Sequence, residues 1–464
     1  MDYSSSDLVI DPALIRKYDV SGPRYTSYPT ADRFSQGFGE HDYNRWLSKR
    51  GSGSAHRPLS LYVHVPFCST VCFYCACNKI VTGDRGKSAR YVGYLQKEIG
   101  MVADRLGGDR RVSQMHWGGG TPTFLQRDEM RALFDTIDTR FERSADCECS
   151  IEVDPRSIEP DMMAFLTDFG FNRVSVGVQD FDPAVQHAVH RVQPESVTRR
   201  VIGEARAAGF RSVSVDLIYG LPKQTVETFN ATIDSVLALD PDRIALYSYA
   251  HLPHRFKPQR RIVAADLPSA DAKLQIMTLA IRRLTGAGYV YIGMDHFAKP
   301  TDELAVAQRE GRLQRNFQGY STRPECDMLG FGVSAIGRVG ATYNQNRKIL
   351  DDYYRALDDG HLPIAGGMEL TADDLVRRAV IQALACQFRL TFKSIELAFA
   401  LDFREYFAAD LLDLERLALD GLVELRPDSI VVTAKGRLLV RVVCMVFDRY
   451  IREGRQQVAY SKVM

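Results

Sequence analysis

The 464-residue sequence lacks any uninterrupted apolar run of about 18 residues, the length that a membrane-spanning helix requires. Its first residues, Met-Asp-Tyr-Ser-Ser-Ser-Asp, lack the basic and apolar segments of a secretory signal. An excess of one charge is also absent, because 59 Lys and Arg residues face 58 Asp and Glu residues, for a net charge of +1. We therefore expect a cytoplasmic protein that neither enters a membrane nor binds nucleic acid.

Cysteine is sparse, and the chain shows no regular disulfide framework: five of its nine cysteines are scattered. The exception is Cys68-x3-Cys72-x2-Cys75, with Cys77 two residues further on. A cubane iron–sulfur cluster takes one thiolate per iron, so three thiols leave one iron open to a reactant. A structural zinc site fits less well, because it would use two ligand pairs set well apart. The spacing therefore favours a cluster held by Cys68, Cys72 and Cys75.

Short β-branched runs alternate with segments of helical periodicity from Leu59 to about Pro300. Such alternation predicts parallel strands joined by right-handed helical crossovers, in a barrel or an open sheet. The helices expected between the strands are 88–106, 128–141, 160–169, 194–208 and 225–239, and a further strand is expected at 289–294. The predicted strands are 59–67, 112–117, 147–153, 173–179, 212–218 and 243–249.

Residues that could take part in binding or catalysis follow the ends of these strands, where the loops of parallel sheets bring functional groups together. The triplet that starts at Gly118 would let a ligand approach the backbone closely. Glu152 and Asp216 are acidic residues in apolar strands, and each needs either a bound ligand or a nearby arginine as its partner. Gln179 is equally well explained as a turn residue and Arg191 as a surface residue.

Two further residues close to the cysteine run leave alternatives open. His64, on the preceding strand, is better explained as a hydrogen-bonded core residue than as a metal ligand. Cys77 is either a small buried apolar residue or a thiol that faces a reaction cavity.

The two flanks of the strand–helix region differ from it. Residues 1–58 include Ser21-Gly-Pro-Arg-Tyr-Thr-Ser-Tyr-Pro-Thr30 and resemble an extended N-terminal arm. Residues 59–370 would form the central domain, and residues 371–464 a mostly helical, winged-helix-like domain. In this last part we expect helices at 372–387, 394–401, 411–420 and 435–452, with a hairpin of strands 422–425 and 430–433.

The cysteine run and Gly118-Gly-Gly-Thr-Pro122 together resemble the radical S-adenosylmethionine superfamily. Over nearly its full length the chain resembles the oxygen-independent coproporphyrinogen III dehydrogenase (oxidase) family. The shared motifs include Tyr62-Val-His-Val-Pro-Phe-Cys68, Ile292-Gly-Met-Asp-His-Phe297 and Arg315-Asn-Phe-Gln-Gly-Tyr320. The resemblance implies an α/β fold, an incomplete (β/α)6 barrel of parallel strands with an N-terminal arm and a mostly helical C-terminal domain.

The resemblance also implies one [4Fe–4S] cluster, held by Cys68, Cys72 and Cys75, and two S-adenosylmethionine molecules. Cys77 falls outside the ligand spacing, and we expect it to be a catalytic residue. The S-adenosylmethionine bound to the cluster would contact Tyr62, Gly119, Glu152 and Ile336. The second would contact Tyr74, Gly120, Thr121, Gln179, Arg191, Asp216 and Ala250.

The activity that the resemblance implies belongs to haem biosynthesis. A 5′-deoxyadenosyl radical would remove hydrogen from two propionate groups of coproporphyrinogen III, and their oxidative decarboxylation would give protoporphyrinogen IX. The expected enzyme is a monomer that acts on this porphyrinogen with an unidentified electron donor and acceptor. A related haem chaperone and a haem-degrading radical enzyme are the alternatives. The chaperone would carry an H-N-x-x-Y-W string, and no His-Asn pair occurs in this chain.

Overall fold

The computed structural model describes residues 8–50, 57–323, 326–454, 460 and 462. Its centre is a 12-stranded sheet with the order β16-β15-β14-β13-β1-β4-β5-β6-β7-β8-β10-β9. Six neighbouring parallel strands run through this sheet in chain order, which confirms the predicted parallel core. They are β1 (Leu59–Val65), β4 (Arg111–Gly119), β5 (Glu142–Val153), β6 (Arg173–Gln179), β7 (Ser212–Tyr219) and β8 (Arg243–Ser248).

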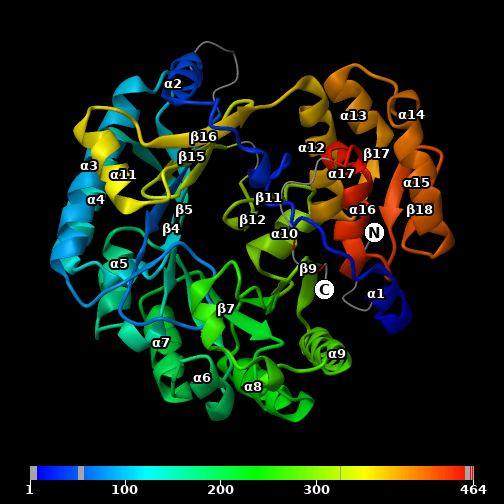
Figure 1. Ribbon diagram of the computed structural model, residues 1–464, viewed down its shortest axis with the longest axis horizontal. Helices are drawn as coiled ribbons and strands as arrows, with labels where there is room; N and C mark the ends of the chain where they lie inside the picture. The colour runs from blue at the N-terminus through cyan, green and yellow to red at the C-terminus, as the bar shows by residue number, and fades with distance from the viewer. Residues whose placement is uncertain (1–7, 51–56, 324–325, 455–459, 461, 463–464) are drawn as a thin grey trace.

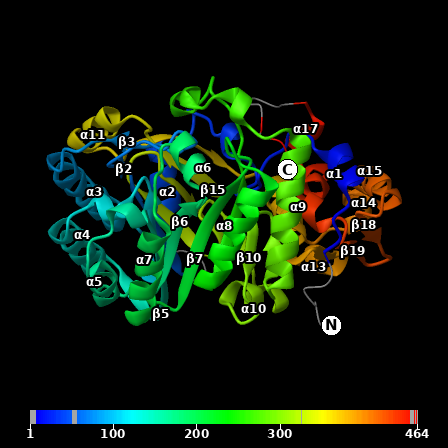
Figure 2. The same ribbon diagram turned by 90° about the horizontal axis from the view of Figure 1, so that it is seen from below.

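Helices connect the parallel strands and cover the outer face of the sheet (Figures 1 and 2). They bury apolar residues at helical spacing, such as Tyr91, Leu95 and Ile99 in the first of them. Six of the seven residues in β1 are buried, so both faces of this strand are covered. The helices are α3 (Gly86–Arg105), α4 (Arg127–Arg140), α5 (Met162–Asp168), α6 (Pro183–Ala188), α7 (Glu195–Ala207), α8 (Val226–Leu239) and α9 (Ala270–Gly286).

Both edges of the sheet carry additional strands. On one side β13 (Asp327–Phe331) pairs in parallel with β1, and three antiparallel strands follow it: β14 (Ile336–Val339), β15 (Thr342–Asn346) and β16 (Ile364–Glu369). On the other side β10 (His296–Ala298) and the expected β9 (Val290–Gly293) are antiparallel. The connections contain α10 (Glu303–Arg309), the hairpin β11 (Gln314–Asn316) and β12 (Gly319–Ser321), and α11 (Leu350–Asp358).

The chain after β16 is mostly helical, as predicted, but the expected last helix at 435–452 is wrong. It is divided into a 3-10 turn at Arg437–Leu439, α16 (Val440–Val446) and α17 (Arg449–Arg452). The Asp448 carboxylate accepts hydrogen bonds from two backbone N–H groups of α17, and so starts a new helix there. The other elements are α12 (Ala372–Gln387), β17 (Arg389–Thr391), α13 (Phe392–Phe399), α14 (Phe403–Tyr406), α15 (Ala408–Leu419), β18 (Val423–Leu425) and β19 (Ser429–Val432).

The N-terminal arm contains α1 (Pro12–Tyr18), a 3-10 turn (Ala31–Arg33) and α2 (Glu40–Lys49). In Figure 1 the arm crosses from the C-terminal helices to the far edge of the sheet. Val9 N–H donates to the Ala434 carbonyl at the first end, and Ser35 pairs with Gly367 of β16 at the other. Within the parts of the chain described above, no helix is long and apolar enough to cross a membrane.

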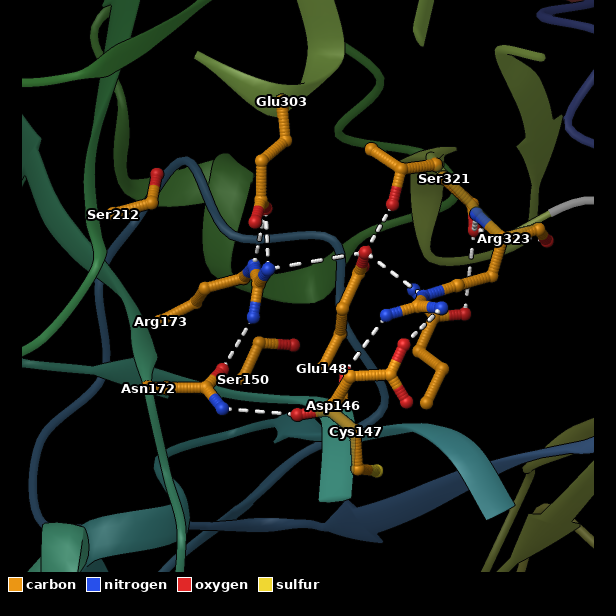
Figure 3. A network of polar contacts seen from close by, with 12 residues as sticks. Asp146, Cys147, Glu148, Ser150, Asn172, Arg173, Ser212, Glu303, Ser321 and Arg323 are labelled. Atoms are coloured by element: carbon orange, nitrogen blue, oxygen red, sulfur yellow. Dashed lines mark hydrogen bonds and ion pairs between the residues drawn. The ribbon is translucent and has the colours of Figure 1, made fainter. Parts of the chain in front are cut away.

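A buried ion network lies toward the amino-terminal ends of β5 and β6 (Figure 3). The Glu148 carboxylate lies 3.8 Å from Arg173 and 3.2 Å from Arg323, and it also accepts a hydrogen bond from the Thr322 hydroxyl. Arg173 pairs in turn with Glu303 of α10. These contacts connect two central strands to the chain that follows β12 and to α10.

Candidate functional site

The cysteine loop leaves the carboxyl end of β1. The short strands β2 (Phe67–Cys68) and β3 (Ile80–Val81) pair in parallel, so the loop between them returns to the edge of the sheet. All of its thiols are free. Cys72 is buried, with 8% of its surface exposed, whereas Cys68 and Cys75 are half-buried and Cys77 is exposed. The alternative of Cys77 as a buried core residue is therefore wrong.

Polar groups from three other segments surround the thiols. Arg191 Nη1 lies 3.5 Å and Arg156 Nη2 lies 3.6 Å from the Cys72 sulfur. The Thr121 hydroxyl donates to the Cys68 sulfur over 3.7 Å. Hydrogen bonds from Cys77, together with Lys79, lower the pKa of Cys75 to about 5. These contacts favour the thiolate form of Cys75, which is the form that binds iron, whereas burial raises the pKa of Cys68 to about 11.

These thiols suit a cubane cluster better than a single ion. Among the residues that the structure describes, no three His, Cys, Asp or Glu side chains are placed to hold one metal ion. A cubane makes a different demand, because each of its irons takes its own thiolate. Three free thiols on one loop, with two guanidinium groups beside Cys72, meet that demand.

The glycine triplet after β4 lies directly against this loop. Gly120 N–H donates to the Val65 carbonyl and Thr121 N–H to the Phe67 carbonyl, both over 2.8 Å. A Cβ atom on Gly119 would lie 2.6 Å from the His64 ring, and one on Gly120 would lie 2.7 Å from the Phe67 carbonyl oxygen. Gly119 also has φ +116°, a conformation that favours glycine. The triplet therefore brings backbone groups close to the thiols.

Glu152, near the end of β5, lies beside the triplet. Gly119 N–H donates to its carboxylate over 3.2 Å, and His116 donates over 3.3 Å. The Glu152 side chain keeps 45% of its surface exposed, yet desolvation is the largest effect on its pKa. It therefore lines a recess inside the protein. The hydrogen bonds outweigh desolvation and hold the pKa of Glu152 below its ordinary value. Neither partner is an arginine, so the sequence-based alternative of an arginine partner is wrong.

Tyr62 and His64 of β1 lie on the same side of the recess. The Tyr62 ring stacks on His116, with 5.9 Å between the ring centroids. His64 Nε2 donates to the Asn78 carbonyl and its Nδ1 accepts from the Tyr62 hydroxyl, each over 3.0 Å. His64 is thus the hydrogen-bonded core residue that the sequence favoured. Ile336 adjoins Tyr62 through Gly330, whose close packing against the Ile336 carbonyl would exclude a side chain.

A second group of residues follows β6 and β7. Arg191 is buried, so the surface interpretation is wrong, and it donates to Asp154 over 3.0 Å and to the Gly177 carbonyl over 2.7 Å. Gln179 ends β6 with φ +72°, close to Gly177. Burial and the nearby Glu152 carboxylate raise the pKa of Asp216 to about 7. Asp216 also accepts a hydrogen bond from the Ser175 hydroxyl over 3.2 Å.

Tyr74 and Ala250 lie at the outer side of this group. Tyr74 packs with Tyr249 in a small apolar cluster that also contains Val189. Tyr249 N–H donates to the Tyr219 carbonyl over 2.9 Å, which places Ala250 just beyond the carboxyl ends of β7 and β8. Most of the site residues that the resemblance implied thus lie at or near the carboxyl ends of the parallel strands, whereas Tyr62 and Asp216 lie within β1 and β7, and Ile336 belongs to β14.

Sequence reasoning missed three residues of this site: His116, Asp154 and Arg156. His116 contacts both Tyr62 and Glu152, and Asp154 joins Arg156 to Arg191. Asp154 and Arg156 lie just after β5, whereas His116 lies within β4, three residues before its end. The criterion that selected Glu152 would have selected Asp154 as well.

Comparisons with known proteins agree with this architecture. The Radical SAM superfamily model matches residues 62–236, and the HemN C-terminal domain model matches residues 370–439. The oxygen-independent coproporphyrinogen III oxidase of Pseudomonas aeruginosa is 52% identical over 456 residues, 98% of each chain. The Escherichia coli enzyme of that name is 50% identical over 454 residues, 98% of each chain.

The chain belongs to the oxygen-independent coproporphyrinogen III oxidase family. A solved structure of the Escherichia coli family member, described as a radical SAM enzyme, superposes with a TM-score of 0.91 at 50% identity. It covers 96% of this chain and 100% of its own. Membership of the radical SAM superfamily implies a [4Fe–4S] cluster and S-adenosylmethionine, which the thiols and the recess described above fit.

Proposed function

We propose that the protein converts two propionate side chains of coproporphyrinogen III to vinyl groups by oxidative decarboxylation, giving protoporphyrinogen IX. The observation that carries this proposal is the family relationship over 98% of both chains. The three-thiol loop beside a polar recess supports it further. When bound, the cluster and S-adenosylmethionine supply the one-electron chemistry that removes hydrogen from a substrate carbon.

We propose Cys68, Cys72 and Cys75 as the cluster ligands, and two S-adenosylmethionine sites in the recess. The site next to the cluster would use Glu152, because its ionised carboxylate suits the ammonium or hydroxyl groups of that molecule. Gly119 would offer backbone groups there. The other site would use Asp216 and Arg191, which lie on later strand ends. The complete assignments remain those that the resemblance implied.

The substrate needs cationic partners for the propionates that stay carboxylates. Arg24 of the arm and Arg315 of β11 are the candidates. Arg315 is 6% exposed, and its Nη1 is buried without a hydrogen-bond partner among the residues that the structure describes. Its Nε donates to the Arg24 carbonyl over 3.4 Å, so the two side chains belong to neighbouring segments. A carboxylate held there would satisfy the unpaired guanidinium atom.

Cys77 is proposed as a catalytic residue because its thiol is exposed while the neighbouring cysteine is a proposed ligand. The variant Cys77→Ser should keep its iron, since serine does not disturb the three ligands, and should lose turnover. Iron analysis and an anaerobic turnover assay measure the two effects. Complete decarboxylation by the variant would show that Cys77 has no catalytic role.

We propose that the chain is divided into an arm at 1–58, a central domain at 59–370 and a C-terminal domain at 371–464. The end of β16 at Glu369 and the start of α12 at Ala372 support the second boundary. We propose that the protein acts as a monomer. The free thiols suit a cytoplasmic enzyme.

Product analysis tests the proposed function. The reconstituted protein is incubated with coproporphyrinogen III, S-adenosylmethionine and dithionite under anaerobic conditions, and the products are separated by chromatography. We expect divinyl porphyrinogen and carbon dioxide. No turnover, with haem bound tightly, would instead identify a haem chaperone, and an opened tetrapyrrole would identify a haem-degrading enzyme.

A further inference from the structure

The segment that follows β8 is strongly basic, although the chain as a whole carries a net charge of only +1. Residues 243–265 contain no Asp or Glu. Within them, Arg255, Lys257, Arg260 and Arg261 are all exposed. We call residues 252–262 the basic segment. In Figure 2 this part of the chain lies above α6, near one end of the sheet.

The basic segment packs directly on the cysteine loop. Gln259 donates to the Tyr74 carbonyl over 3.0 Å, and the Arg261 guanidinium lies 5.3 Å from the centroid of the Phe73 ring. Phe73 immediately follows Cys72, and its N–H donates to the Val189 carbonyl. The basic segment and the end of α6 therefore cover the cysteine loop from outside.

The basic segment has a defined shape rather than that of a loose loop. Gln259 is buried, and its side chain accepts a hydrogen bond from Leu252 N–H over 2.6 Å. Ile262 is buried in the same apolar cluster as Tyr249. Arg260 donates to the Pro253 carbonyl over 3.0 Å. The cationic groups are thus presented on an ordered surface.

These cations differ from most others in the protein. In the described part of the chain, none of the four forms an ion pair with a carboxylate: the ion pairs of the neighbouring elements involve Lys223, Arg243 and Asp266 instead. Four unpaired, exposed cations on one short segment raise the local positive potential and attract an acidic surface.

The position decides between two acidic occupants. A porphyrinogen must reach the recess, and Arg24 and Arg315 are already the proposed partners for its carboxylates. The basic segment instead contacts the loop that carries the proposed cluster ligands, through Tyr74 and Phe73. A carrier protein docked on the basic segment would therefore lie next to those ligands.

We propose that the basic segment is the docking surface for an acidic one-electron carrier protein that reduces the cluster. This inference rests on the proposed function, because it assumes a loaded cluster. In the step, one electron leaves the reduced carrier and enters the [4Fe–4S] cluster. The carrier is oxidised by one electron, the cluster is reduced by one, and no bond forms or breaks.

The test uses the reconstituted holoenzyme and reduced flavodoxin, an acidic carrier. The double variant Arg255→Glu, Lys257→Glu reverses two of the cations, which are not among the proposed cofactor ligands. The second-order rate of flavodoxin oxidation, followed by stopped-flow absorbance, should fall about tenfold or more, because electrostatic steering raises association rates by about 10- to 1,000-fold. The wild-type rate should fall with added salt. Turnover with dithionite should stay at the wild-type level.

The control variant Lys393→Glu, Lys435→Glu makes the same change in net charge on exposed residues of the C-terminal domain. It should keep the flavodoxin rate within about twofold of wild type. Calorimetry with cluster-free chains should show weaker flavodoxin binding for the variant Arg255→Glu, Lys257→Glu, and unchanged binding for the control variant.

Three results would overturn the inference: an unchanged flavodoxin rate, an equal loss in the control, or a raised KM for the porphyrinogen with dithionite as reductant. The last result would assign these cations to the substrate instead. A wild-type enzyme that oxidises flavodoxin but forms no vinyl product would refute the proposed function and leave the docking surface standing.

Discussion

Glu148 and Glu152 lie four residues apart on the same strand, yet their surroundings differ. Glu148 is 9% exposed and lies between two guanidinium groups and a hydroxyl, so its charge is matched by the protein itself. Glu152 is 45% exposed toward a recess and has only a histidine and one backbone N–H as partners. A completed network helps to specify the fold, whereas an incomplete one leaves capacity for a ligand.

The cysteines show the same difference. Cys147 and Cys149 are buried in the middle of β5, with their sulfurs 3.6 Å apart. Cys68 and Cys75, in the chain that follows β1, keep part of their surface exposed. Similar side chains are thus structural within the sheet and available for chemistry beyond its carboxyl edge.

The largest expected effect separates these two groups of cysteines. Cys72→Ser should abolish cluster assembly, because it removes one of the three thiols proposed to hold the irons. Iron and sulfide analysis of the anaerobically purified protein measures the loss. Cys147→Ser serves as the matched control and should retain a full cluster. Equal iron contents in the two variants would refute the ligand assignment.

The next largest expected effect is the loss of stability when the ion network around Glu148 is broken. Glu148→Gln should lower the free energy of unfolding by about 3 kcal/mol, because Arg173 and Arg323 lose the buried carboxylate between them and keep only the more exposed Glu303 and Asp146. Denaturant titration of the cluster-free protein gives this value. Glu152→Gln should cost far less stability, since its carboxylate has no guanidinium partner to strand. A larger loss for Glu152→Gln would reverse our comparison.

The smallest effect is a pH dependence at the recess. Burial and Glu152 raise the pKa of Asp216 from 3.8 to about 7. Below pH 3.8 both the folded and unfolded states hold this proton, so the group makes no difference. Between pH 3.8 and pH 7 only the folded state holds the Asp216 proton, so the free energy of unfolding falls as the pH rises. Above pH 7 both states have lost the proton, and the free energy of unfolding stays at this lower value.

Asp216→Asn should therefore gain roughly 1–4 kcal/mol over wild type as the pH rises through this window. Denaturant titrations of cluster-free protein without S-adenosylmethionine, repeated across the pH range, provide the measurement. A constant difference between variant and wild type would mean that Asp216 ionises normally.

The sequence predicted the regions whose local pattern agrees with their tertiary role. The parallel strands are apolar runs bounded by helices, and the proposed cluster ligands share a short loop, so both can be recognised locally. The strands β14 to β16 escaped prediction because they are short, and because buried polar residues such as Asn344 and Asn346 break their apolar pattern. Their hydrogen bonds come from distant segments, as when Asn346 donates to Glu98 over 2.6 Å.

Partnerships across the chain were also beyond sequence reasoning. The pairing of Arg191 with Asp154 joins residues that lie 37 positions apart. The break in the last helix depends partly on Asp448, which also accepts a hydrogen bond from Tyr25 of the arm over 3.0 Å. Local periodicity carries no information about such contacts.

The anchorage of the arm has a consequence for synthesis on the ribosome. Tyr25 binds Asp448, and Arg441 donates to the carbonyls of Gly22 and Pro23, so the beginning of the chain is held by residues made more than 400 positions later. Central strands can form during translation. The arm can reach its final place only after α16 and α17 have left the exit tunnel, which makes its docking one of the last events of maturation.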